Sequence, residues 1–173
     1  MKKFTAYEIA LSALSCAFAV LFLTLGAYVE ILRATGYLFA SASLLLPLAK
    51  KSYKGYALAY VGSSLLAFIF VGGRFFELLP FLMFFGLHPL LNELQLRFKI
   101  NTWVACFVKA LWFDLSLYLI WRFVFGMQSA IPTLDRYIVP LILILGTGFF
   151  VFYDYTLYKA RDAINELARR FMK

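Results

Sequence analysis

One stretch of this chain places four side chains with useful chemistry on a single helical face. Asp114 is followed by Tyr118, and then by Trp121 and Arg122, at spacings that keep all of them on one side of an α-helix. The stretch lies inside an apolar segment, where ionisable groups are costly and are therefore candidates for function. An acid, a phenol, an indole and a guanidinium leading outward from mid-membrane predict a binding site for a small polar or aromatic solute.

The acid at the inner end of this stripe has a simpler alternative interpretation. Asp114 would pair with Lys109 or His88 and so satisfy the interior of a helical bundle, with no ligand involved. His88, Asn92, Glu93, Lys109 and Asp114 would then form one polar network between the fourth and fifth membrane spans. Pro89 follows His88 and would bend the fourth span.

The element that carries the stripe is one of six predicted membrane helices. The chain has 173 residues, of which 64% are hydrophobic and 15% charged, with a mean hydropathy of +0.83. Soluble domains carry about 25% charged residues, so the composition predicts an all-α polytopic membrane protein. The expected spans are Ala6–Tyr28, Gly36–Ala49, Tyr56–Val71, Leu78–Leu94, Trp103–Phe125 and Ile138–Tyr158.

The basic residues predict how these spans are oriented. Most of the 17 Lys and Arg residues fall into clusters at every second gap between apolar runs: Lys2–Lys3; Lys50, Lys51 and Lys54; Arg97 and Lys99; and Lys159, Arg161, Arg169, Arg170 and Lys173. Cytoplasmic loops of membrane proteins carry this excess of positive charge. We therefore expect both termini in the cytoplasm of a bacterial cell, with the plasma membrane as the lipid partner. No basic face outside the membrane suggests nucleic acid as a partner.

The loops and the tail complete this organisation. Two outer connections, Gly72–Glu77 and Gly126–Arg136, contain the Gly and Pro residues typical of loops. Arg74 and Glu77 lie in the first of them, so we add both to the predicted solute site. Residues 1–158 are expected to form the transmembrane domain, and residues 159–173 a basic amphipathic tail on the inner surface.

Motifs for catalysis are missing from the sequence. It contains no HExxH motif, no Gly-rich phosphate loop and no Cys/His cluster. One histidine and two separated cysteines do not supply a usual zinc site. The sequence therefore predicts a protein that is not an enzyme and uses no metal or other cofactor.

The first span carries a second pattern, which concerns packing. Ala6, Ala10, Ala13 and Ala17 recur on one helical face. Small residues four positions apart let helix backbones approach closely in a membrane. The pattern fits packing within the bundle, or docking of a partner helix.

The architecture resembles the substrate-binding S components of energy-coupling factor vitamin transporters. The shared features are a basic amino terminus, an alanine-spaced first helix, six spans, a short second span and two outer loops. The resemblance implies that the alanine face docks onto the transmembrane T component, which carries the ATPase subunits, and that a vitamin-like solute binds in the outer half. The segment Phe84–Leu91 also resembles uncharacterised S-component-like membrane proteins of low-GC bacteria.

A structural role is the alternative. The chain is similar in length, span number and hydrophobicity to the rod-shape-determining (MreD-like) membrane proteins, which act as scaffolds for cell-wall synthesis. Such a scaffold needs no ligand site in the middle of the membrane, whereas the stripe that begins at Asp114 favours binding.

Overall fold

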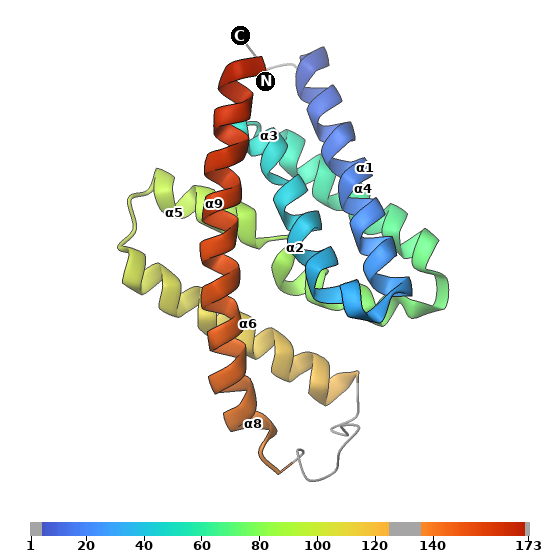
Figure 1. The fold of residues 1–173 in the computed structure, drawn as a ribbon, viewed down its shortest axis with the longest axis vertical. Helices are drawn as coiled ribbons and strands as arrows, with labels where there is room; N and C mark the ends of the chain where they lie inside the picture. Colours follow the sequence, from blue (N-terminus) through green and yellow to red (C-terminus); the bar gives the residue numbers. More distant parts are fainter. Residues whose placement is uncertain (1–4, 125–135, 172–173) are drawn as a thin grey trace. The chain divides into compact units, whose positions relative to one another are not determined.

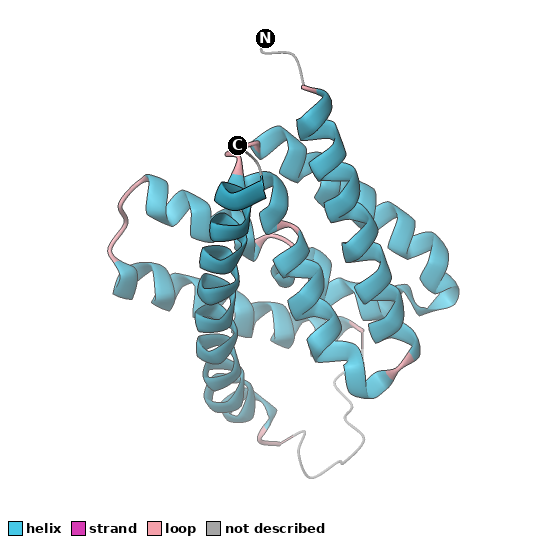
Figure 2. Cartoon of the chain, turned by 45° about the horizontal axis from the view of Figure 1, so that its top comes forward, coloured by secondary structure: helices cyan, strands magenta, loops and turns pink. Residues whose placement is uncertain are grey.

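The computed structural model describes residues 5–124 and 136–171, apart from the side chains of residues 168–171. Within these ranges the chain forms six helical segments and no strand (Figure 2), which confirms the all-α prediction. Five of the described segments are long and apolar enough to cross a membrane. They are compatible with a multi-pass membrane protein.

The elements follow one another as interrupted helices. They are α1 (Ala6–Tyr28); η1 (Glu30–Leu32), α2 (Arg33–Ser43) and α3 (Leu45–Ala49); α4 (Tyr53–Val71) with the 3₁₀ turn η2 (Gly72–Leu78); the π turn η3 (Phe81–Phe85) with α5 (His88–Arg97); α6 (Thr102–Phe123); and α8 (Ile138–Leu141), the π turn η4 (Ile142–Gly146) and α9 (Thr147–Phe171). They divide into two compact units. Unit 1 holds the described residues of Met1–Glu93 and Leu157–Lys173, and unit 2 those of Leu94–Thr156.

In unit 1, α1 packs against both α2 and α4 (Figure 1). The first helix begins at a capping box, in which the Thr5 hydroxyl accepts from the Glu8 amide and the Glu8 carboxylate accepts from the Thr5 amide. Helices α1 and α2 approach closely at Gly36. A Cβ there would lie only 2.8 Å from the Phe22 carbonyl oxygen, so a side chain would force the helices apart.

The predicted spans and the observed helices agree except for the fourth span. The first span coincides with α1, and the spans predicted around α2–α3, α4, α6 and α8–α9 each have a counterpart among the five. The fourth, expected over Leu78–Leu94, is not one of these five helices. It is divided into η2, η3 and α5, with Pro80 directly before the π turn and Pro89 at the start of α5.

Hydroxyl groups from α2 and α4 stabilise this interrupted segment. A break in a helix leaves backbone carbonyls without their usual partners, and an apolar interior supplies no water to replace them. Four side-chain hydroxyls donate to backbone carbonyls here: Tyr37 to Glu77, Ser41 to Phe85 (2.7 Å), Tyr56 to Gly86 and Tyr60 to Leu82 (2.8 Å). Side-chain hydroxyls thus replace part of the helix ladder, and this allows the segment to remain buried without forming a continuous span.

A similar exchange occurs near Pro47, which lies in α3. Proline has no N–H group, so it cannot donate to the carbonyl four residues earlier, which is that of Ser43. The chain divides into α2 and α3 at this point, and the buried hydroxyl of Ser15 on α1 donates to the Ser43 carbonyl at 2.8 Å. The interruption therefore becomes a contact between two helices.

Candidate functional site

The candidate site lies in unit 2, between α6 and the interrupted helix formed by α8, η4 and α9. Helix α6 begins where the Asn101 side chain accepts a hydrogen bond from the Trp103 amide at 2.9 Å. Asp114 occupies the middle of α6 and is only 5% exposed. A buried carboxylate in an apolar helix requires compensation, and its contacts therefore define the site.

One oxygen of this carboxylate is held and the other has no hydrogen-bond partner. The Thr147 hydroxyl, at the start of α9, donates to Asp114 Oδ2 at 2.8 Å. Asp114 Oδ1 is buried and makes no hydrogen bond within the described part of the chain. Thr147 thus fixes the orientation of a carboxylate whose second oxygen is buried without a hydrogen-bond partner.

Gly146 makes room for that second oxygen. A Cβ at this position would lie 2.6 Å from Asp114 Oδ1 and 3.4 Å from Leu117 Cδ1. Gly146 is also the last residue of the π turn η4, which widens the helix just before Thr147. Such π turns occur frequently at functional sites.

Next to the carboxylate lies a cavity of about 400 Å³ that is open to the surface, since Leu111, Leu115, Val139 and Leu143 in its lining are exposed. Its lining residues all belong to unit 2: Leu111, Asp114, Leu115, Tyr118, Val139, Ile142 and Leu143. Asp114 and Tyr118 supply its polar groups, and the other side chains are aliphatic. The volume falls in the range of small-molecule sites, which are mostly apolar with a few polar groups that orient the ligand.

A buried ion pair connects the same two helices. Lys109 Nζ lies 2.9 Å and 3.1 Å from the two carboxylate oxygens of Asp154, and both residues are buried. Within the described residues of unit 2, Asp114 bonds to Thr147 and forms no ion pair with Lys109, so the predicted pairing of Asp114 with Lys109 is wrong. Asp154 also lies inside a predicted span. Ionisable groups in membrane spans are candidates for function, so the reasoning that singled out Asp114 applies to Asp154 as well.

Of the residues predicted for the solute site, Asp114 and Tyr118 line the cavity. Trp121 lies one turn further along α6, with its ring centroid 5.9 Å from that of Tyr118. Its buried Nε1 has no hydrogen-bond partner in the described structure. Arg122 is exposed. The predicted stripe is therefore present on α6, but only its inner half reaches the cavity.

Arg74 and Glu77, the other two predicted site residues, belong to unit 1. The Arg74 guanidinium donates to the Ala27 carbonyl at 3.2 Å and lies over the Tyr28 ring. Glu77 forms an ion pair with Arg33 at 3.1 Å. The predicted outer loop Gly72–Glu77 is mostly the 3₁₀ turn η2, and these contacts attach it to the start of α2 and the end of α1. The second predicted loop, Gly126–Arg136, lies outside the described residues except for Arg136.

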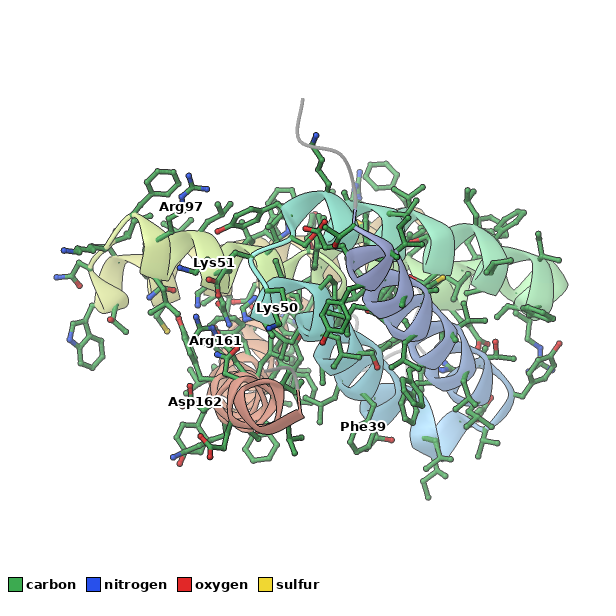
Figure 3. All side chains as sticks on the ribbon, turned by 90° about the horizontal axis from the view of Figure 1, so that it is seen from above. Phe39, Lys50, Lys51, Arg97, Arg161 and Asp162 are labelled. Carbon is green, nitrogen blue, oxygen red and sulfur yellow. The ribbon has the colours of Figure 1, made fainter. Side chains whose placement is uncertain are left out.

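A further polar pair occurs in unit 1. Glu93 Oε2 accepts from Arg161 Nη2 at 2.8 Å and from Nε at 3.0 Å, across 68 positions of sequence. Arg161 belongs to the predicted tail, and α9 continues through it without interruption. Arg161 and the exposed Asp162 extend from α9 in Figure 3.

The alanine face of α1 is exposed. Ala6, Ala10, Ala13 and Ala17 are all accessible, whereas Ser12, Ser15 and Ala19 on the opposite side of the helix are buried. Serine and alanine positions other than the predicted ones thus mediate packing within unit 1. The alanine face is available to a partner helix or to lipid.

Sequence reasoning did not find Thr147, Gly146 or the aliphatic wall of the cavity. A threonine, a glycine and several leucines are too common in membrane helices to be distinctive. Among the described residues, no three His, Cys, Asp or Glu side chains are grouped so as to hold a metal ion. Comparison of the chain with family models, curated proteins and solved structures finds no match.

Proposed function

We propose that the chain is a membrane-embedded binding subunit that captures a small solute in the cavity of unit 2. The observation that supports this is the Asp114 carboxylate, which is buried, is oriented by Thr147 and lines a cavity of about 400 Å³ with one oxygen unpartnered. A purely structural carboxylate is expected to have both oxygens satisfied. A solute with a hydrogen-bond donor would satisfy the second.

The proposed context is uptake through an energy-coupling factor transporter. In this proposal both termini are cytoplasmic, the cavity receives a vitamin-like solute from outside, and the exposed alanines of α1 contact the T component. The exposure of Ala6, Ala10, Ala13 and Ala17 supports the last point, because a face already packed within the bundle has no surface left for a partner. The T component and its ATPase subunits would supply the energy.

Ligand-dependent stability tests the binding function. The protein, reconstituted in lipid nanodiscs, is heated with each member of a vitamin and metabolite panel, and the midpoint of unfolding is followed by circular dichroism. A bound solute raises the midpoint, because it stabilises only the folded state. Asp114→Asn is expected to abolish the shift. Asp162→Asn, which changes an exposed aspartate in the same way, is the matched control and is expected to retain the shift.

The partner is tested by affinity capture from membranes solubilised in mild detergent. Recovery of an ATPase module with its T component supports the transporter proposal, and Ala10→Leu and Ala13→Leu are expected to reduce that recovery. If no solute shifts the midpoint and cell-wall synthesis proteins are recovered instead, the scaffold alternative replaces the proposal.

A further inference from the structure

The lining of the cavity specifies a charge for the solute. We propose that the solute is an organic cation, with one protonated amine that binds Asp114 and an apolar body that fills the aliphatic part of the cavity. This inference rests on the proposed binding function. It adds the chemical class of the ligand, which neither the architecture nor the resemblance to vitamin transporters defines.

The first argument concerns the charge of Asp114. Its Oδ1 atom is buried without a partner, and Oδ2 is bonded to a neutral hydroxyl. Lys109, the basic residue nearest to Asp114 along α6, is paired with Asp154 through both carboxylate oxygens. Buried charges in proteins are normally paired. In unit 2, Asp154 is paired with Lys109, and the ammonium group of a ligand would pair with Asp114.

The second argument concerns geometry. Gly146 lets the helix backbone lie close against Oδ1, since a Cβ there would come within 2.6 Å of this oxygen. Thr147 holds the opposite oxygen at 2.8 Å, so the carboxylate cannot turn away without breaking that bond. A carboxylate fixed in this way is preorganised for a donor, and preorganisation lowers the entropic cost of binding.

The third argument concerns the rest of the lining. Leu111, Leu115, Val139, Ile142 and Leu143 offer only hydrocarbon to the solute. Tyr118 adds a phenol ring, which suits a cation or an apolar group equally. Among the described residues the lining contains no basic side chain, so a solute with its own carboxylate or phosphate would meet Asp114 with no compensating charge. This lining favours an amphiphilic amine over an acid.

The experiment uses matched probes that differ only in their polar end. One series is tryptamine, tryptophol and indole-3-propionate, and the other is octylamine, octanol and nonanoate. Binding to the full chain in nanodiscs is measured by isothermal titration calorimetry, with empty nanodiscs as the background. At least one amine is expected to bind about 30-fold or more tightly than its alcohol and acid, because truncating one partner of a buried charge pair has an effect of this size.

Two variants assign the binding to the cavity. Asp114→Asn is expected to remove the preference for amine over alcohol, and Asp162→Asn is expected to leave it unchanged. If Asp114→Asn does not fold, Val139→Phe tests the same cavity from its apolar wall without altering the carboxylate, and it is expected to weaken amine binding.

The outcomes separate this inference from the proposed function. If an alcohol or acid binds as tightly as its amine, or if amine binding survives Asp114→Asn, the assignment of a cationic solute is wrong. If both amines fail while a neutral or acidic member of the metabolite panel binds in an Asp114-dependent manner, binding stands and the cation is excluded. If neither the probes nor the panel bind, both proposals fail.

Discussion

Replacing Gly146 by alanine tests the geometry of the site without removing any polar group. The new Cβ would lie 2.6 Å from Asp114 Oδ1, whereas ordinary contact begins near 3.4 Å. The carboxyl group or the helix must therefore move by the difference, 3.4 − 2.6, or about 0.8 Å. A displacement of this size is enough to break the 2.8 Å hydrogen bond from Thr147, since such bonds weaken beyond about 3.0 Å.

The expected change in stability is the balance of two terms. Overpacking a buried position destabilises a protein by about 1–3 kcal/mol. Alanine is more favourable than glycine within a helix by roughly 0.5–1 kcal/mol. We therefore expect Gly146→Ala to lower the free energy of unfolding by up to about 2.5 kcal/mol, and to weaken solute binding because the carboxylate has moved.

Gly148 provides a matched control two residues further along the same chain. A Cβ there would have no heavy atom within 4 Å, so Gly148→Ala is expected to be neutral or to stabilise the protein by up to about 1 kcal/mol. Both variants are unfolded by titration with sodium dodecyl sulfate in mixed micelles, and loss of structure is followed by tryptophan fluorescence. If Gly146→Ala is as stable as Gly148→Ala, the carboxyl group of Asp114 does not lie against residue 146, and the argument for the site is refuted.

Three further predictions concern other parts of the structure. Tyr60→Phe is expected to destabilise unit 1 by about 1–3 kcal/mol, because it removes the donor to a carbonyl of the interrupted fourth segment. In the same unfolding assay Ser64→Ala should be nearly neutral, because the Ser64 hydroxyl bonds only a carbonyl of its own helix. Lys109→Met removes the lysine of a buried ion pair and leaves the Asp154 carboxylate without that countercharge, so a loss of about 3–5 kcal/mol in the free energy of unfolding is expected. With both native cysteines replaced by alanine, Ile31→Cys should react with an impermeant maleimide on intact cells, whereas Lys50→Cys should react only after lysis.

Each of these predictions has an outcome that contradicts it. Equal stability of the Tyr60 and Ser64 variants would mean that the tyrosine hydroxyl does not support the interrupted segment. A Lys109→Met protein of wild-type stability would show that the ion pair contributes nothing to folding. Labelling at position 50 but not at position 31 on intact cells would reverse the proposed orientation of the chain.

The site illustrates what could be predicted from residues alone. Asp114 and Tyr118 were identifiable because an acid inside an apolar helix is rare and four residues along a helix return to the same face. The partner of Asp114 was not identifiable, since the side chain that bonds it lies 33 positions away and is a threonine, a common residue in such helices. The prediction that Lys109 would pair with Asp114 considered charge and neglected helical spacing, because residues five positions apart on α6 do not lie on the same face.

The sequence by itself determined the all-helical architecture and the positions of most apolar helices. A run of about 20 apolar residues, a capping box and a proline each act within one continuous segment of chain, so their effects are visible in the local sequence. The tertiary structure decided which polar groups meet. Packing brings hydroxyls of α2 and α4 to the carbonyls of the broken fourth segment, and places Asp114 beside Gly146 and Thr147. In a medium without water, each buried polar group must find a partner within the protein, and packing determines which partner is within reach.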